Sequence, residues 1–280
     1  MNTELFIKTR KKLGYSQEEL SKGICTQATL SKFEKSGKAP SIKILIRLCE
    51  RLGLTLDDIF PITSKSETDA IKKLDHAEFQ LITSEFDTAK KELASIKKDD
   101  LQDKALMQYY FIKGFVSALE DAPLSDTLFY FDQILNGLDD DHQTVFSLLA
   151  FTGVGTAYFR NGEIDKSEFY FQKVFDSLYS LPLDDERAVW RALSMIFYTA
   201  DYYAHAKEYD TSNSLLEYAY GICAKSHVTY YVARIQFRRA QNIREAGQDD
   251  KRIGEYLNDA AAFARINNNQ KLLKRIEDFV

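Results

Sequence analysis

Apolar positions follow two different patterns along this 280-residue chain. Up to about residue 60 the apolar runs are short, and glycines and a proline interrupt them. Beyond that point, segments of 15–20 residues with helical spacing alternate with short polar turns, and no strand-like alternation competes. The pattern predicts an all-α protein in which a small helical bundle precedes a longer array of helices.

The longer part of the chain is predicted to consist of helix pairs. In three places an aromatic helix ends in a tight turn at Gly162, Lys207 or Gly247, and an acidic residue then begins the next helix, where the helix dipole favours negative charge. Such a pair cannot bury its apolar face alone, so neighbouring pairs are expected to stack into a solenoid. We expect a bundle in residues 1–61, a linker at 62–66, and about five degenerate tetratricopeptide-like pairs with a final capping helix in residues 67–280.

One stretch of the first part, SQEELSKGICTQATLSKFEKSG, carries the signals of a helix-turn-helix. Ser16 and Glu19 have the spacing of a capping box. A glycine then permits a tight turn, and Thr26 can cap a second helix in which Leu30 and Phe33 face inward. Apolar residues on either side of this stretch complete a compact five-helix bundle.

Charge is divided unevenly between the two parts. Residues 1–61 carry 11 Lys or Arg against 7 Asp or Glu, while the whole chain has a net charge of −5. A small basic module on a large acidic body indicates that only the first part contacts a polyanion. Three scattered cysteines fit a reducing cytoplasm rather than a disulfide framework. The absence of an apolar run of membrane-spanning length or of a signal peptide leads us to expect a cytoplasmic protein without membrane contact.

The pattern SQEEL-x6-TQATLSKFEKSG-x2-PS resembles the DNA-binding domain of phage-repressor-type (Xre/Cro-like) regulators. The turn is one residue shorter than in the phage repressors, and this shorter form is similar to that of the PlcR/Rgg group of peptide-responsive regulators. That group joins such a domain to a degenerate tetratricopeptide array of about this length. The resemblance implies a transcription regulator that binds a near-palindromic operator as a homodimer and responds to a short signalling peptide.

The resemblance places the second short helix in the DNA major groove, with its N-terminal residues at the base edges. With the apolar side inward, Gln can pair with adenine, Lys with guanine, and Ala can touch a thymine methyl group. Other polar residues would contact phosphates, which position the protein and make binding dependent on salt. The expected base-reading residues are Thr26, Gln27, Ala28, Ser31 and Lys32, and the expected phosphate contacts are Gln17, Lys35, Lys38 and Lys43.

Other polar and apolar residues of the bundle have structural interpretations. The resemblance implies that Arg10 and Glu34 form an internal salt bridge between the first helix and the recognition helix. Cys25 and Cys49 lie among apolar positions and are expected to be small core residues, with a redox sensor as the alternative.

In the PlcR/Rgg group, polar residues one turn apart on successive first helices hold the peptide. The family often uses Asn on two of these helices, where this chain has Thr and Tyr. Arg234 and Arg238 lie one turn apart and could clamp a carboxylate, or could be ordinary exposed charges. The expected peptide-binding residues are Thr152, Thr156, Tyr198, Asp201, Tyr202, Arg234, Arg238, Gln241 and Asn242.

No constellation for catalysis or for a cofactor is evident, so we expect neither an enzyme nor a metal protein. The four histidines are isolated from one another, and the common metal, phosphate-loop and nucleophile motifs do not occur. The cluster at residues 139–142 is interpreted as a capped turn rather than a metal site. Two alternatives remain open: a protein-interaction adaptor built on the helical array, and a repressor of the same type that needs no ligand.

Overall fold

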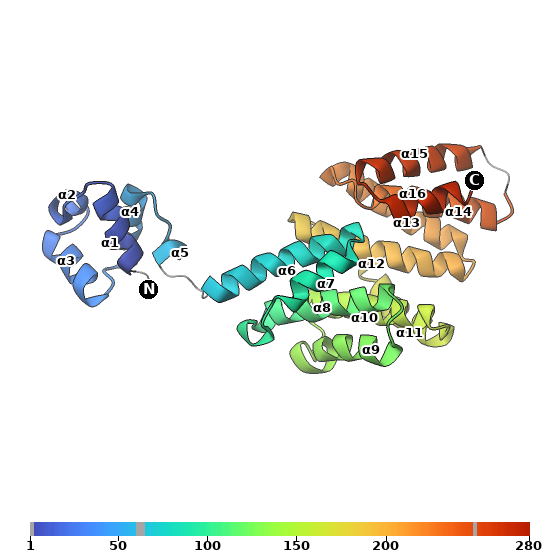
Figure 1. Cartoon of the computed structure of the whole chain (residues 1–280), viewed down its shortest axis with the longest axis horizontal. Coiled ribbons are helices and arrows are strands. Elements are labelled where there is room, and N and C mark those ends of the chain that lie inside the picture. The colour runs from blue at the N-terminus through green and yellow to red at the C-terminus, as the bar shows by residue number, and fades with distance from the viewer. Residues whose placement is uncertain (1–2, 60–64, 249–250) are drawn as a thin grey trace. The chain divides into compact units, whose positions relative to one another are not determined.

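The computed structural model describes residues 3–59, 65–248 and 251–280, and in these residues every regular element is a helix. The chain divides into two compact units, Met1–Thr68 and Asp69–Val280 (Figure 1). The predicted all-α fold class is confirmed. Residues 62–64 of the predicted linker lie outside the described residues, and α6 begins at Lys65.

The first unit is a five-helix bundle around one apolar core. Phe6 of the first helix and Phe33 of the third meet edge to face, with ring centroids 5.1 Å apart. Leu20 and Leu30 are fully buried beside them, so the predicted inward side of the second short helix is confirmed. The helices are α1 (Thr3–Lys12), α2 (Gln17–Ser21), α3 (Gln27–Ser36), α4 (Ile42–Leu52) and α5 (Leu56–Ile59).

The second unit is an array of helix pairs (Figure 1). Its pairs are α6 (Lys65–Thr83) with α7 (Phe86–Ala94), α8 (Asp103–Leu119) with α9 (Leu124–Gln133), α10 (Val145–Arg160) with α11 (Ile164–Phe175), α12 (Glu186–His205) with α13 (Tyr209–Ser226), and α14 (Val232–Glu245) with α15 (Arg252–Ile266). The last helix is α16 (Gln270–Glu277), and short helical turns occur at η1 (Lys98–Asp100), η2 (Ile134–Leu138) and η3 (Leu178–Ser180).

The turns inside two of these pairs have the predicted form. Gly162 and Lys207 both adopt a positive φ, and Glu163 and Glu208 directly precede α11 and α13. The acidic residues predicted at the corresponding place before α15, at positions 249 and 250, lie outside the described residues.

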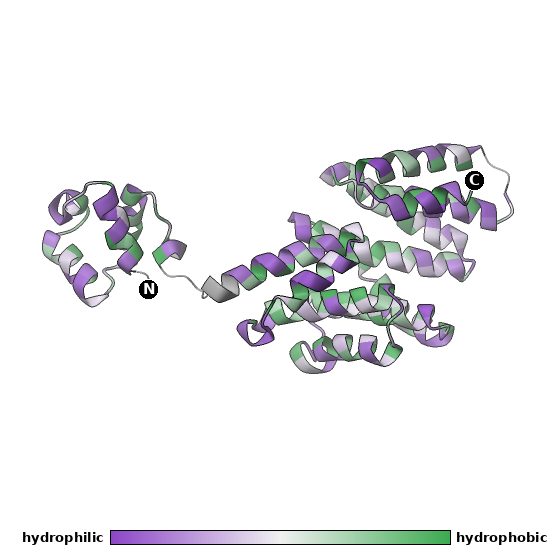
Figure 2. Cartoon of the chain, viewed as in Figure 1, coloured by the Kyte–Doolittle hydropathy of each residue, from purple (hydrophilic) through white to green (hydrophobic). Residues whose placement is uncertain are grey.

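Close packing in the middle of the array depends on two glycines. The ring of Phe131 from α9 fits between Gly114 of α8 and Gly153 of α10. A Cβ atom on Gly153 would lie 2.1 Å from Cζ of Phe131, and one on Gly114 would lie 2.6 Å from the same ring. Helices α8 and α10 are rich in hydrophobic residues, as expected for the centre of an array (Figure 2).

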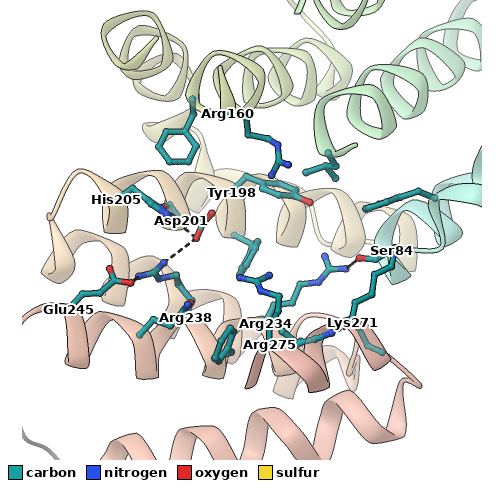
Figure 3. A pocket seen from close by; sticks show the side chains of 18 residues that line it. Ser84, Arg160, Tyr198, Asp201, His205, Arg234, Arg238, Glu245, Lys271 and Arg275 are labelled. Carbon is teal, nitrogen blue, oxygen red and sulfur yellow. Dashed lines mark hydrogen bonds and ion pairs between the residues drawn. The ribbon is translucent and has the colours of Figure 1, made fainter. Parts of the chain in front are cut away.

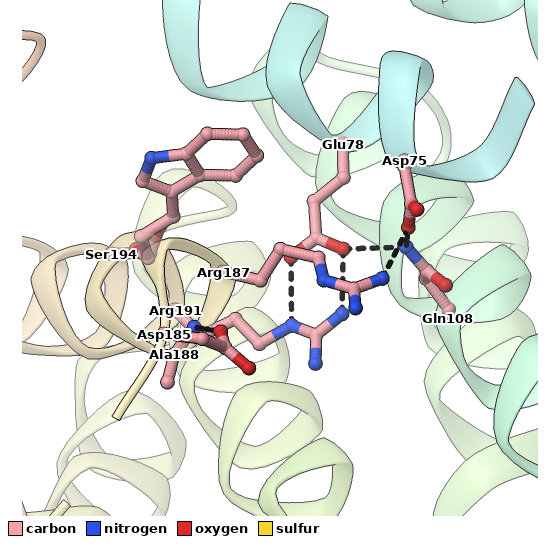
Figure 4. Close-up of polar contacts among 9 residues, drawn as sticks. Asp75, Glu78, Gln108, Asp185, Arg187, Ala188, Arg191 and Ser194 are labelled. Carbon is pink, nitrogen blue, oxygen red and sulfur yellow. Dashed lines mark hydrogen bonds and ion pairs between the residues drawn. The ribbon is translucent and has the colours of Figure 1, made fainter. Parts of the chain in front are cut away.

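Helix α6 packs not only on its neighbour but also on helices of the fourth and fifth pairs. The carboxylate of Glu78, which is fully buried, accepts two hydrogen bonds of 2.7 Å from the guanidinium of Arg191 on α12 (Figure 4). Gln108 of α8 donates a further hydrogen bond to Glu78. The ring of Phe79 contacts those of Trp190 and Tyr230, at centroid distances of 5.3 and 5.2 Å. The array therefore curls until its first helix meets its later pairs.

The length and hydropathy of the described helices also bear on membrane contact. Among the residues that the structure describes, no helix combines the length and the apolar character needed to cross a bilayer.

Candidate nucleic-acid interface and ligand cavity

Local hydrogen bonds define both ends of the helix-turn-helix. Ser16 accepts a hydrogen bond from the backbone of Glu19, whose side chain accepts one from the backbone of Ser16, which is the predicted capping box. Thr26 accepts from the backbone N–H of Thr29 and so caps α3 as predicted. Gly37 ends α3 in the left-handed region, with φ +67°.

The polar side of α3 faces outward from the first unit. Among the expected base-reading residues, Thr26, Gln27, Ala28 and Lys32 are exposed and Ser31 is half-buried. The hydroxyl of Thr26 already accepts the capping hydrogen bond from Thr29. It is therefore less available to a base than the other expected base-reading side chains. This side of α3 presents amide, hydroxyl, methyl and ammonium groups, the set that can distinguish base pairs in the major groove.

A chain of polar contacts orients the start of α3. Arg10 donates two hydrogen bonds to the carboxylate of Glu34, at 2.7 and 2.9 Å, and the implied salt bridge is present. Glu34 also accepts a hydrogen bond from Gln17, and Gln17 accepts one from Gln27, both of 2.8 Å. The expected phosphate contact Gln17 is therefore half-buried and positions the expected base reader Gln27.

The remaining expected phosphate contacts are exposed lysines. Lys35, Lys38 and Lys43 follow one another from the end of α3 to the start of α4. None of them forms an ion pair with any residue that the structure describes, so their charge is available to an anion.

The cysteines of the first unit differ in burial. Cys49 lies in the core, with 1% of its surface exposed, whereas Cys25 is half-buried and packs against the edge of the core. Burial raises the pKa of both thiols, which disfavours the reactive thiolate.

A cavity of about 500 Å³ lies inside the curl of the second unit (Figure 3). First helices of the later pairs, α16 and the turn between α6 and α7 contribute its walls. Five expected peptide-binding residues line it, namely Tyr198, Asp201, Arg234, Arg238 and Gln241. Its apolar surface comes from Phe86, Leu119, Phe159, Phe197, Phe237 and Leu272.

The other four expected peptide-binding residues do not line this cavity. The Thr152 and Thr156 hydroxyls are buried and donate to carbonyls one turn earlier in α10. Tyr202 stacks on Phe171 with ring centroids 4.7 Å apart. Asn242 is fully buried, and its amide bonds residues of α13 and α14. These side chains are used in packing between helices and do not line this cavity, so their predicted contact with a ligand stays a prediction.

Arg238 is neutralised inside the cavity. Its guanidinium lies 3.7 Å from Asp201 and 2.6 Å from Glu245, and its Nε donates to Asn242. Among the residues that the structure describes, Arg234 donates hydrogen bonds to two neutral oxygens: the carbonyl of Ile82 at 2.8 Å and the hydroxyl of Ser84. The two guanidinium groups therefore have different partners in this structure, and a joint clamp of Arg234 with Arg238 on a carboxylate stays a prediction.

Two cations that line the cavity were not predicted from the sequence. Lys271 and Arg275 lie one turn apart on α16, which the sequence suggested only as a capping helix. Their spacing on one helical face was the available signal.

The acidic cluster at the end of η2 is a capped turn, as expected. Asp139 accepts hydrogen bonds from the backbones of Gln143 and Thr144 and from the hydroxyls of Thr144 and Ser147. Burial raises the pKa of Asp139, but these hydrogen bonds outweigh it and lower the pKa to about 2. Within the described residues, no group of three or more His, Cys, Asp or Glu is placed to hold a metal ion.

Comparison with known proteins agrees with this architecture. Residues 7–59 match the family described as Helix-turn-helix. The fold of the whole chain is similar to that of Bacillus thuringiensis PlcR in complex with the peptide PapR7 and DNA, with a TM-score of 0.74 at 16% identity over 98% of both chains. No curated protein resembles the chain closely enough in sequence to count as a match.

Two further solved structures share the fold. ComR from S. thermophilus, in complex with DNA and its signalling peptide ComS, has a TM-score of 0.67 at 15% identity, covering 98% of this chain and 96% of ComR. The SHP pheromone receptor Rgg2 from Streptococcus dysgalactiae has a TM-score of 0.51 at 10% identity, covering 100% of this chain and 98% of Rgg2. The predicted resemblance to the PlcR/Rgg group is thus confirmed at the level of the fold.

Proposed function

We propose that this protein is a sequence-specific transcription regulator whose DNA binding is set by a short signalling peptide held in the cavity of its helical array. The helix-turn-helix match and the shared fold with PlcR and ComR, both solved with DNA and a peptide, support this function. The observation that carries it is the exposed polar side of α3 above a fully buried apolar side.

The DNA target is a near-palindromic duplex bound by a homodimer. One short recognition helix contacts only a few base pairs, and two copies on half-sites one helical turn apart supply the rest of the specificity. The cytoplasm is the compartment in which such a regulator meets its operator. No catalytic step is part of this function.

In vitro selection with the full-length chain and random duplexes tests the DNA-binding half. We expect enrichment of a two-fold symmetric sequence, followed by loss of affinity as salt rises, because lysines that contact phosphates release counterions. Substituting Lys35→Ala should lower the slope of log affinity against log salt by about 0.9 per copy.

Lys225→Ala, on the exposed surface of α13, is the control for charge alone and should leave the slope unchanged. Failure to enrich any sequence above the random pool would reject specific DNA binding.

The proposal that the protein binds a peptide is supported by the cavity in the second unit. Its volume of about 500 Å³ lies within the range of about 300–1,000 Å³ typical of ligand pockets. Aromatic walls and a few polar groups suit an extended peptide, whose unpaired backbone amides need donors and acceptors. A peptide can shift the array between two arrangements only as far as its affinity for them differs.

Affinity for the selected duplex, measured with and without pooled synthetic heptapeptides, tests this half. We expect the peptide pool to change the apparent dissociation constant. Tyr198→Ala, which enlarges the cavity, should reduce that change, whereas Tyr179→Ala on the outer surface should not. Identical DNA affinity with and without every pool would support the ligand-independent repressor instead.

A further inference from the structure

We propose that Arg234, Lys271 and Arg275 form a carboxylate site at one side of the cavity, and that this site selects peptides carrying an unblocked carboxylate. This inference rests on the proposed function, since it specifies the ligand of the same cavity. It replaces the pair of arginines on α14 that the sequence suggested with a site built from α14 and α16, at the C-terminal end of the array.

The cavity carries an excess of positive charge. Five Lys or Arg residues line it against two carboxylates. Both carboxylates, Asp201 and Glu245, pair with the single residue Arg238. Arg160 pairs with Asp121, which does not line the cavity. The three remaining cations therefore have no ion-pair partner among the described residues.

The three cations line the same cavity. In Figure 3, Asp201, His205, Arg238 and Glu245 gather at one side of the cavity, and Ser84, Arg234 and Lys271 lie toward the other. Arg234 belongs to α14, whereas Lys271 and Arg275 project from successive turns of α16. A carboxylate entering this region would meet positive groups from two helices.

Each of the three cations lies near an aromatic ring. The guanidinium of Arg234 lies 5.1 Å from the ring of Tyr231 and that of Arg275 lies 5.5 Å from the ring of Phe237. The ammonium of Lys271 lies 5.9 Å from the ring of Phe86. Arg234 is half-buried, whereas Lys271 and Arg275 are exposed at the rim of the cavity, so their attraction for a carboxylate comes from the number of converging positive charges rather than from burial.

Arg234 also connects this region to the start of the array. It donates to the carbonyl of Ile82, near the end of α6, and to the hydroxyl of Ser84 in the following turn. Both partners are neutral oxygens, and a carboxylate is a stronger acceptor for a guanidinium than either. A bound carboxylate would thus be sensed where the first and fifth pairs meet.

Four pools of random heptapeptides test the proposal, with free or amidated C-termini and with or without Asp and Glu. Each pool is equilibrated with the full-length protein, and retained peptides are quantified by mass spectrometry. We expect carboxylate-bearing peptides to be retained about tenfold more than the amidated pool without Asp and Glu, since a charge-assisted pair is worth roughly this factor.

The two carboxylate sources are separated by the mixed pools. Enrichment of the free, Asp- and Glu-free pool identifies the C-terminal carboxylate, and enrichment of the amidated, acidic pool identifies a side chain. Either result supports the site.

The double variant Lys271→Gln/Arg275→Gln should remove the preference while the amidated, uncharged pool is retained as before. Lys274→Gln, an exposed lysine on the same helix outside the cavity, is the matched control and should keep the preference. Arg234→Gln should also weaken the preference for carboxylate-bearing peptides. Thermal unfolding of this variant is measured in parallel, because Arg234 donates a hydrogen bond to the carbonyl of Ile82 in α6.

The outcomes that overturn the proposal are distinct from those that overturn peptide binding. Retention of all pools to the same extent, or a preference that survives the double variant, rejects the carboxylate site and leaves peptide binding standing. Retention of no pool rejects peptide binding itself, and the carboxylate site with it.

Discussion

The side-chain amide of Gln27 donates a hydrogen bond of 2.8 Å to Oε1 of Gln17, across the turn that separates α2 from α3. Gln17 is held in turn by Glu34, and Glu34 by Arg10. The first side chain of α3 is therefore oriented by a series of contacts that ends in the interior of the bundle.

Replacing Gln27 should weaken specific DNA binding without unfolding the protein. We expect Gln27→Ala to weaken binding to the selected duplex by about 1–3 kcal/mol, because a side chain that can pair with a base edge is lost. Gln17→Ala should have a smaller effect, since it only frees Gln27 to rotate. Fluorescence anisotropy with matched and scrambled duplexes measures both. Gln172→Ala on the exposed side of α11 is the control, and unchanged affinity of Gln27→Ala would remove it as a base reader.

The stability of the array should depend on pH through Asp139. Its pKa of about 2 in the folded protein lies below the value of about 3.9 expected for an unfolded chain. The charged form is thus favoured by folding, and its contribution, roughly 2–3 kcal/mol, is present above about pH 4 and is lost as the pH falls toward 2. Urea unfolding between pH 5 and pH 2 should show a smaller acid loss for Asp139→Asn than for the unchanged protein. Asp140 is an exposed neighbour, so Asp140→Asn should lose as much stability in acid as the unchanged protein. If the free energy of unfolding fell equally with pH in the unchanged protein and both variants, Asp139 would not be the source of the pH dependence.

The buried pair of Glu78 and Arg191 should show strong coupling. Removing the charge of either partner leaves the other buried and unpaired, which costs about 3–5 kcal/mol. We therefore expect Glu78→Gln and Arg191→Met to destabilise the array strongly, and the double variant to be more stable than the sum of the two losses implies. Arg187→Gln breaks only the exposed pair with Asp75 and should cost at most about 1 kcal/mol. If the losses of stability in the two single variants added up to the loss in the double variant, Glu78 and Arg191 would not be energetically coupled.

The packing of Phe131 predicts a large effect of one methyl group. Gly153→Ala would place a Cβ atom 2.1 Å from this ring, and overpacking of this kind typically costs about 1–3 kcal/mol. Gly137→Ala has no atom within 4 Å of its new Cβ and should be tolerated. Thermal unfolding compares the two. Adding Phe131→Leu should partly rescue Gly153→Ala, and if it does not, the clash is not the cause.

The features that the sequence predicted well are those set by neighbouring residues. The capping box of Ser16 with Glu19, the Thr26 cap and the inward side of α3 all depend on spacings of a few residues. Helical periodicity and turn residues were enough to locate the helix pairs. The cap around Asp139 was predictable for the same reason.

The residues that line the cavity were predicted less well from the sequence. Helix α10 is hydrophobic on nearly all sides, so periodicity does not tell which side meets the ligand, and its Thr152 and Thr156 hydroxyls bond their own helix. The partners of Arg234 lie about 150 positions away in the chain. They depend on how far the array curls, which is the sum of many small rotations between pairs.

The contact of Arg234 with the carbonyl of Ile82 also bears on how the array opens. Repeat proteins are stabilised by nearest neighbours, and their terminal units are usually the first to exchange amide protons with solvent. Here the first helix is bonded to the fifth pair, so neither end can detach without breaking contacts of the other. Hydrogen exchange should report α6 and α14 as a single cooperative unit, and the chain should behave in this respect as a closed ring and not as a linear stack.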